Sequence, residues 1–396
     1  MKIIFAESHN LDRPDPLGSH HYIRLFREAG HDCLWLGPAI SPMHIGKPDH
    51  LNRHRYRIWR EDGRMVDGIQ WLVPLTLLFY YHKPFLRSLY AGRKQYHFCL
   101  PPLAGQLRKI GFSQVDLIWC AGPAALSLLD IIPHRLSCYR LADRLDQFAM
   151  IPPNVGVIQQ ELIEKVDFVL ATSLALQEWA EESSRREVYY MPNGVSDEFF
   201  TANLQMPDDF PADGRPVALY LGTMDTRFDL ETLAAAVRQM PEVHFLLIGP
   251  LTCDSLREGM SALQEKENFS LLGPREYSQA PAYLQHASVG LIPFHDNKLT
   301  AAVNPIKYYE YLACGLPVVA PPLRELKAMG GPLQAYRAGD GGDFCRAIRE
   351  ALAEKEKKGR AVRKERIDFA TGQTWRARFR SIMEILEKKG LKDNNL

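Results

Sequence analysis

Hydrophobic and polar positions along the chain alternate between short apolar runs and longer amphipathic stretches. Residues 2–6 form an apolar run that is followed by a polar loop rich in proline. Residues 20–29 then carry apolar side chains at helical spacing, Gly30 ends that pattern, and residues 32–36 are again apolar. The order strand, loop, helix, strand predicts the opening of a doubly wound α/β domain.

Two further series of buried strands follow, and most of them end at a glycine, a proline or an acidic residue. The first series is expected at residues 115–120, 135–141 and 168–171. The second is expected at residues 217–221, 244–248, 269–272, 288–293 and 318–320, with a helix at 230–239. A polar break at residues 203–214 separates the series. We therefore predict an N-terminal Rossmann-like domain at 1–200 and a second at 201–375, followed by a C-terminal helix at 376–396 that could pack back on the first.

Composition narrows the class of protein. The chain has 396 residues, a formal net charge of +1, 46% hydrophobic and 24% charged residues, which is typical of a soluble globular protein without a nucleic-acid partner. Its seven cysteines form no Cys-x-x-Cys pair, so neither a zinc site nor a disulfide framework is indicated, and buried thiols in a reducing compartment are expected. No signal peptide and no apolar stretch of about 20 residues is found, so a cytoplasmic location is expected.

The segment 304–320, which reads NPIKYYEYLACGLPVVA, has the strongest chemical signal. Lys307 and Glu310 are three residues apart, so they share one face of a helix, and Pro305 suits a first helical turn. A helix N-terminus beside a lysine can bind a diphosphate, and a carboxylate one turn later can accept hydrogen bonds from ribose hydroxyls. The alternative is an ordinary surface ion pair between Lys307 and Glu310.

This segment resembles the donor-binding segment of glycosyltransferase family 4 and its GT-B relatives, in which a glutamate binds ribose and a basic residue faces the donor phosphates or sugar. The resemblance extends to the strings at residues 192–199, 221–223, 248–250 and 272–274. It implies the GT-B fold, with two Rossmann-like domains facing across a cleft, and a nucleotide-sugar as substrate. On this resemblance we expect the donor to contact Gly222, Thr223, Met224, Arg227, Arg275, Asn304, Ile306, Lys307 and Glu310.

The chain departs from the family 4 pattern at two places. The loop 223–229 offers Arg227 where the family has an arginine and a lysine. Ala302 stands eight positions before Glu310, where the family has a second glutamate. The chain also resembles the inverting xanthan glucuronosyltransferases, because residues 139–143 read YRLAD and match their Tyr-Arg-x-x-Asp motif. That resemblance implies that Asp143 is the general base.

The position of Asp143 supports this role independently. It follows an apolar strand, where a carboxylate can face a cleft and deprotonate an acceptor hydroxyl. The alternative is a helix cap or an ion pair with Arg140 or Arg144. The chain has no Asp-x-Asp motif, so we expect neither a metal ion nor another cofactor. Lys307, a helix N-terminus and Arg227 or Arg275 could neutralise the leaving group instead.

Two parts of the N-terminal half are candidates for the acceptor side. His9, His20 and His21 lie in the first loop and helix start, a region that faces the acceptor in GT-B enzymes. His9 is the first choice and His20 the second, with ordinary loop or capping roles as the alternative. Residues 68–94 mix aromatic residues and leucines with Lys83, Arg87, Arg93 and Lys94, which suits a peripheral membrane contact and a lipid-linked acceptor. The alternative for this segment is a core helix.

Together these observations predict an inverting, metal-independent glycosyltransferase. It would move a sugar, as a hexosyl or glucuronosyl group, from a UDP-sugar to a hydroxyl of a lipid-linked or polysaccharide-precursor acceptor, at the inner face of the membrane or in the cytoplasm. Three alternatives remain. They are a retaining family 4 reaction, a UDP-sugar epimerase with the same fold, and a subunit that binds a sugar nucleotide without catalysis.

Overall fold

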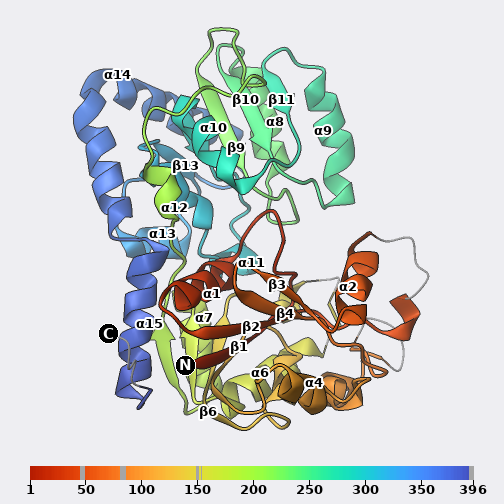
Figure 1. The fold of residues 1–396 in the computed structure, drawn as a ribbon. Coiled ribbons are helices and arrows are strands. Elements are labelled where there is room, and N and C mark those ends of the chain that lie inside the picture. The colour runs from red at the N-terminus through yellow and green to blue at the C-terminus, as the bar shows by residue number, and fades with distance from the viewer. Residues whose placement is uncertain (45–49, 81–85, 149–150, 153, 392–396) are drawn as a thin grey trace. The chain divides into compact units, whose positions relative to one another are not determined.

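Two parallel sheets organise the chain into two units (Figure 1). The computed structural model describes residues 1–44, 50–80, 86–148, 151–152 and 154–391. The N-terminal unit comprises Met1–Pro192 and the chain from Phe379 onward, and the C-terminal unit comprises Asn193–Arg378. Both units alternate strands with helices, which confirms the predicted α/β class with two Rossmann-like domains.

The N-terminal unit contains an eight-stranded sheet in the order β3-β4-β2-β1-β5-β6-β7-β8. All strand pairs are parallel except β3 with β4. Its elements are β1 (Lys2–Ala6), α1 (Gly18–Glu28), β2 (Asp32–Leu36), η1 (Pro42–His44), α2 (His50–Arg60), β3 (Arg64–Val66), β4 (Ile69–Leu72), α3 (Leu89–Lys94), η2 (Gln95–Phe98), α4 (Leu103–Lys109), β5 (Val115–Cys120), α5 (Ala125–Leu128), β6 (His134–Leu141), η3 (Leu145–Gln147), α6 (Val155–Lys165), β7 (Phe168–Ala171), α7 (Leu174–Ser183) and β8 (Glu187–Tyr190).

Aromatic packing across the central strands holds this sheet together. Phe5 on β1 stands opposite Trp35 on β2 and Trp119 on β5, and its ring centroid lies 5.1 Å from that of Trp119. Phe26 of α1 contacts Phe5 and Trp119 edge-to-face. Such rings remove a large apolar area from water, which is the main stabilising contribution of a core. The carboxyl ends of β1, β5 and β6 are thereby fixed side by side.

The C-terminal unit contains a parallel sheet in the order β11-β10-β9-β12-β13-β14, which is the 3-2-1-4-5-6 order of dinucleotide-binding folds. Its elements are η4 (Asp197–Phe200), β9 (Val217–Leu221), α8 (Leu230–Gln239), β10 (His244–Ile248), η5 (Asp254–Leu256), α9 (Arg257–Gln264), β11 (Phe269–Leu271), η6 (Tyr277–Gln279), α10 (Ala280–His286), β12 (Val289–Leu291), α11 (Lys298–Ala301), α12 (Ile306–Ala313), β13 (Val318–Ala320), α13 (Arg324–Met329), β14 (Gln334–Ala335), α14 (Gly341–Thr371) and the start of α15 (Trp375–Lys388).

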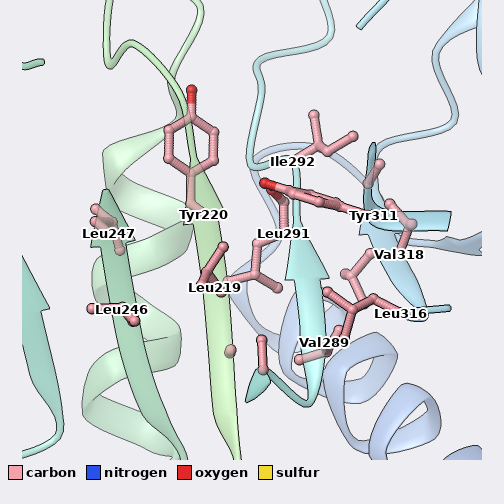
Figure 2. Close-up of a cluster of buried hydrophobic side chains, with 14 of the residues drawn as sticks. Leu219, Tyr220, Leu246, Leu247, Val289, Leu291, Ile292, Tyr311, Leu316 and Val318 are labelled. Carbon is pink, nitrogen blue, oxygen red and sulfur yellow. The ribbon is translucent and has the colours of Figure 1, made fainter. Parts of the chain in front are cut away.

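The core of this unit lies between the sheet and helices α8, α12 and α14. Figure 2 shows side chains of β9, β10 and β12 packed together, with the ring of Tyr311 from α12 beside Leu291. The Tyr311 hydroxyl lies 2.9 Å from the amide nitrogen of Leu221, whose N–H it accepts, and 3.3 Å from the carbonyl oxygen of Leu291, to which it donates. Because Tyr311 joins the ends of β9 and β12, it ties α12 to the two central strands.

The unit boundaries differ from the predicted ones at residues 200 and 375. Residues 193–200 belong to the C-terminal unit because Val195 forms a bridge with Thr374 and Phe199 is fully buried in that unit's core. The end of α15 belongs to the N-terminal unit, where Phe379 makes an edge-to-face contact with Phe26. The polar composition of residues 203–214 predicted a break between the units. The ends of the units are instead set by tertiary contacts of residues 193–200 and of Phe379.

The segment 68–94 is not the core helix that was one of its two interpretations. Ile69–Leu72 is the buried strand β4, and helix α3 starts only at Leu89. Lys83 lies outside the described residues. None of the described helices is long and apolar enough to cross a membrane. The seven thiols are free, and six are buried as expected, whereas Cys253 is partly exposed.

Candidate donor and acceptor sites

The C-terminal unit brings the predicted donor residues to the point where its strand order reverses. This point lies between β9 and β12, which are neighbours in the sheet, and ligands of such folds bind outside the carboxyl ends of the strands there. Gly222 directly follows β9, and Phe294 follows β12 closely. Lys307, in the first turn of α12, places its ammonium nitrogen 5.0 Å from the ring centre of Tyr220 and 4.8 Å from that of Phe294.

The loops after β9 and β10 approach each other and Lys307 too closely for larger side chains. Gly222 has a φ of 141°, and a Cβ atom there would lie 3.1 Å from Cε of Lys307. A Cβ atom on Gly249 would lie 2.2 Å from the carbonyl oxygen of Gly222. Glycine at both positions therefore leaves the backbone open for Lys307 and for a close ligand. The predicted glycine loop and the predicted lysine are thus neighbours in space.

Lys307 is a half-buried cation. Burial and, to a smaller extent, the charge of Arg227 together lower the pKa of Lys307 to about 8, against the opposing effect of Glu310 and Asp225. The two aromatic faces stabilise the ammonium group by cation–π attraction. A desolvated cation next to an open backbone is suited to receive a negatively charged group, because electrostatic attraction is strong where water is excluded.

Glu310 is buried, with only 4% of its surface exposed. Burial raises the pKa of its carboxyl group to about 7, and the Tyr277 hydroxyl donates a hydrogen bond to Oε1 at 2.9 Å. The structure describes the side chains of both Glu310 and Lys307, and no ion pair joins these two residues. The surface ion pair that was the alternative interpretation is therefore absent, and the two side chains remain available on one face of α12.

The remaining donor-site candidates divide into two groups. Met224 is buried and its N–H donates to the carbonyl oxygen of Pro250 at 2.9 Å, so it holds the loops together. The carbonyl oxygen of Thr223 accepts a hydrogen bond from Tyr220 at 2.7 Å. Arg227 pairs with Asp225, at 2.9 Å between Nε and Oδ1, and its charge acts on Lys307. The charge of Arg227 therefore acts at the same site as that of Lys307.

Arg275 and Asn304 have structural partners. Arg275 donates to Asp209 at 2.6 Å and to the carbonyl oxygen of Leu272 at 2.6 Å, so its guanidinium is held at the end of β11. Asn304 is buried and its Oδ1 accepts hydrogen bonds from the N–H of Asn193 and the hydroxyl of Tyr309, both at 3.1 Å. These contacts fix the approach to α12. Ile306, the first residue of α12, is half-buried.

In the N-terminal unit, Asp143 follows β6 and is half-buried. Gln159 of α6 donates to its carbonyl oxygen at 3.1 Å and to the Tyr139 hydroxyl at 2.8 Å. Arg144, one of its possible ion-pair partners, instead pairs with Asp146, at 2.7 Å between Nη2 and Oδ2. The backbone that carries Asp143 is therefore fixed by α6 and does not depend on a pairing with Arg144.

Glu7 is a second carboxylic acid at this edge of the sheet, and sequence reasoning gave it no role. It directly follows β1, is 6% exposed, and receives a hydrogen bond from Ser19 at the start of α1. Its Oε1 has no hydrogen-bond partner among the described residues. Burial raises its pKa to about 7, although Ser19 and Arg140 act in the opposite direction. An acidic residue directly after the first buried strand was the signal that could have identified it.

We expect Glu7→Gln to change the pH dependence of stability. The native pKa of Glu7 lies above the ordinary value of 4.5, so folding favours the protonated form, and that stability is lost as pH rises through about 7. Above pH 7 the buried carboxylate should cost on the order of 3 kcal/mol, from the size of the pKa shift. Thermal unfolding should therefore show Glu7→Gln more stable than the parent at pH 8, and nearly equal at pH 5.

Glu61→Gln is the matched control for this measurement, because Glu61 is exposed. Its unfolding temperature should follow that of the parent at both pH values. If Glu7→Gln lowers stability at pH 8 and not at pH 5, the carboxylate stabilises the fold and the expected sign is wrong.

The predicted acceptor-side histidines differ in their surroundings. His20 is buried, and its Nδ1 accepts the N–H of Leu17 at 3.2 Å, so its Nε2 carries the proton donated to the carbonyl oxygen of Asn10 at 2.9 Å. Burial lowers the pKa of His20 to about 3. His20 thus caps α1 in its neutral form, whereas His9 is exposed.

His9 lines a cavity of about 520 Å³ within the N-terminal unit. Its walls are the loop after β1 and one side of α2, and the lining residues are His9, Asn10, Asp12, Arg13, Pro14, Asp15, Leu51, His54 and Arg55. Polar pairs order these walls, including Arg55 Nε to Asn10 Oδ1 at 2.7 Å and His54 Nε2 to Asp12 Oδ2 at 2.7 Å. Such planar amide, carboxylate and guanidinium groups can hydrogen-bond the hydroxyls of a sugar. In the described part of the chain, no three His, Cys, Asp or Glu side chains gather to hold a metal ion.

Comparison with known proteins finds relatives by sequence and by fold. The family model of glycosyl transferases group 1 matches residues 215–354. TuaH of Bacillus subtilis (strain 168), named as a glycosyltransferase of teichuronic acid biosynthesis, is 30% identical over 233 residues, which are 56% of this chain and 57% of TuaH. The aligned part of the chain thus spans a little over half the length of this relative.

Solved structures show the same fold over nearly the whole chain. Sucrose-phosphate synthase from Thermosynechococcus elongatus superimposes with a TM-score of 0.72 at 16% identity, over 98% of both chains. HepE from Anabaena, solved with UDP and glucose, superimposes with a TM-score of 0.68 at 15% identity, over 98% of this chain and 100% of HepE. The chain therefore has the GT-B fold, and its residues 215–354 match the family model of glycosyl transferases group 1.

Proposed function

We propose that the protein is an inverting glycosyltransferase that moves a sugar from a UDP-sugar to a hydroxyl group of a polysaccharide precursor. One observation carries the proposal: Lys307 and Glu310 lie on one face of α12, at the point where the strand order of a group 1 domain reverses. HepE, which shares the fold, was solved with UDP and glucose, and TuaH is named for teichuronic acid biosynthesis. The HepE complex supports a UDP-sugar donor, and the name of TuaH supports a polysaccharide product.

The proposed reaction needs a general base and a group that stabilises the leaving diphosphate. The carboxylate of Asp143 takes the proton of the acceptor hydroxyl as its oxygen bonds to the anomeric carbon of the sugar. The bond from that carbon to the diphosphate breaks, and the electron pair leaves with the nucleoside diphosphate. Lys307, supported by Arg227 and the N-terminus of α12, stabilises the negative charge that develops. Glu310 accepts hydrogen bonds from the ribose hydroxyls, which fixes the nucleotide.

The nucleotide base of the donor can be identified by ligand stabilisation. We expect UDP-sugars to raise the thermal unfolding temperature more than GDP- or ADP-sugars at equal concentration, because a ligand that binds only the native state stabilises it by mass action. Differential scanning fluorimetry with the three nucleotide classes is the test. Glu310→Ala should remove most of the shift, since it deletes the ribose contact.

Glu325→Ala would be a poor control because Glu325 is buried and bonded to Asn304. The exposed Glu267→Ala is a better control, and it should keep the parent's response. Stabilisation by none of the three nucleotide classes would remove the donor-site proposal. A preferred shift with GDP- or ADP-sugar would retain the site and change the donor.

We also propose a peripheral membrane contact beside α3, which would suit a lipid-linked acceptor. Leu77 and Tyr90, from the segment 68–94, are 55% and 59% exposed, and the neighbouring Phe98 is 40% exposed and in ring contact with Tyr90. Exposed apolar side chains next to basic ones suit a lipid surface. Arg93 and Lys94 pair with Glu161 and Asp130, which reduces their contribution to charge attraction.

Leu77→Ser/Phe98→Ser should reduce sedimentation with vesicles of phosphatidylcholine and phosphatidylglycerol several-fold, because it removes the apolar area that would enter the lipid. Met206→Ser is the control, since Met206 is a similarly exposed apolar residue of the C-terminal unit. If the parent protein does not sediment with these vesicles, the membrane contact is wrong while the donor site is unaffected.

A further inference from the structure

The C-terminal unit has a cavity at the opposite edge of its sheet from Lys307. The cavity has a volume of about 290 Å³. Residues 287–288 and 315–317 line it and directly precede β12 and β13, so it lies at the amino ends of these parallel strands. Gly222 follows the carboxyl end of β9, which is parallel to β12. This amino-edge cavity is therefore distinct from the donor site.

A break in α14 forms the outer wall of the amino-edge cavity. Gly359 has φ 47° and ψ −124°, which interrupts the helix. Glu354 and Arg366 nevertheless form an ion pair, although a straight helix would separate residues twelve apart by about 18 Å. The chain must therefore change direction at Gly359, and glycine permits the positive φ. The break brings residues before and after it to the same cavity.

The described residues that line this cavity carry more positive than negative charge. Its lining includes three arginines, Arg360, Arg363 and Arg366, and one acidic residue, Glu354. Arg366 is 4% exposed, pairs with Glu354 and donates from Nη1 to the carbonyl oxygen of Gly315 at 3.2 Å. Arg366 thus balances the negative charge of Glu354 within the wall of the cavity. Arg360 and Arg363 are exposed, and within the described part of the chain neither forms an ion pair.

Arg363 is held at the cavity by the turn between α12 and β13. Gly315 has a φ of 77°, and a Cβ atom there would lie only 2.4 Å from Cγ of Arg363. The arginine stem therefore packs directly on the backbone of Gly315. Cys314 also lines the cavity, but burial raises its pKa to about 12 and its thiol donates to the carbonyl oxygen of Phe199. The thiol is therefore not a reactive nucleophile, and the cavity's chemistry lies in its arginines.

We propose that the amino-edge cavity binds a phosphate-bearing anion through Arg360 and Arg363. Guanidinium groups bind phosphate oxygens with two parallel hydrogen bonds, and the neighbouring Leu316 and Pro317 exclude water from part of the wall. The volume lies just below the range of about 300–1,000 Å³ that is usual for organic ligands, so it accommodates a phosphate or diphosphate rather than a whole nucleotide-sugar. The anion comes either from free phosphates in solution or from a lipid headgroup.

Titration calorimetry with inorganic pyrophosphate tests the proposal on the full chain carrying Lys307→Met, a change that weakens diphosphate binding at the donor site without adding a competing phosphate. Arg360→Gln/Arg363→Gln should weaken pyrophosphate binding at least about tenfold, because it removes two charged donors. Lys364→Gln is the matched control, since Lys364 is exposed on the same helical segment and does not line the cavity. With the control substitution added, the Lys307→Met chain should bind pyrophosphate as tightly as before.

Vesicles distinguish the two sources of the anion. If the parent sediments with vesicles that contain phosphatidylglycerol but not with pure phosphatidylcholine, and the double variant loses this binding, the anion belongs to a headgroup. If the double variant matches the parent in both pyrophosphate titration and vesicle sedimentation, the proposal is overturned. Failure of the parent to bind UDP would contradict the proposed function alone, because the amino-edge cavity does not depend on it.

Discussion

Replacing Asp143 with Asn should reduce the rate of sugar transfer by about 100- to 10,000-fold, the usual contribution of a general base. The amide has nearly the same shape as the carboxylate but cannot accept a proton from the acceptor hydroxyl. Its backbone should stay in place, because Gln159 holds the carbonyl oxygen of residue 143. Release of UDP and formation of product measure the rate, and calorimetry should show that donor affinity is unchanged.

Asp146→Asn is the control for this experiment. Asp146 lies in the same loop and pairs with Arg144, so its loss disturbs the loop without removing the proposed base. A rate for Asp143→Asn close to that of Asp146→Asn would exclude the assignment of Asp143. Proton NMR of the product reads the anomeric configuration in the same assay. An unchanged configuration would favour the retaining alternative, for which Ala302 leaves the family's second glutamate missing.

Lys307→Met is expected to reduce transfer by about 100- to 1,000-fold, comparable with the loss of one donor from a site that stabilises developing negative charge. Methionine keeps much of the length of the lysine stem and its contact with Gly222, but it removes the charge between the Tyr220 and Phe294 rings. The larger part of the loss should be in kcat, because charge on the leaving diphosphate grows as its bond to the sugar breaks. Steady-state kinetics with a UDP-sugar provide the measurement.

The pH dependence of the same site provides a second readout. Burial lowers the pKa of Lys307 to about 8, so the ammonium form is lost as pH rises above that value and kcat should fall. Lys307→Arg should remove this dependence because arginine stays charged. The exposed Lys298→Met should leave both kcat and KM unchanged. A normal rate for Lys307→Met would show that the leaving group is stabilised elsewhere.

Much of the fold could be predicted because its central strands are continuous apolar runs. Val115–Cys120 and His244–Ile248 have the predicted bounds, since both are buried in parallel sheets and end in loops. The edge strand β3 was missed because its three residues are mostly exposed and carry no pattern. The turn at Asp67 and Gly68, both with positive φ, contains the one local signal for that hairpin.

The candidate site could be predicted only where its residues are close in the sequence. Lys307 and Glu310 are close in sequence, so helical spacing alone placed them on one face. The roles of Arg275 and Asn304 could not be predicted, because their partners Asp209 and Asn193 lie 66 and 111 residues away. Glu7 was missed because a single carboxylic acid in a loop shows its burial only after Ser19 and Arg140 pack around it.

The hydrogen bonds between Asn193 and Asn304 bear on how the donor domain could be transplanted into another protein. The matched region 215–354 contains Asn304 but neither Asn193 nor the bridge between Val195 and Thr374. An excised domain with those bounds would leave Oδ1 of Asn304 without the N–H of Asn193, directly before the helix that carries Lys307. A chimeric enzyme with a changed sugar donor should therefore exchange residues 193–378 as one block.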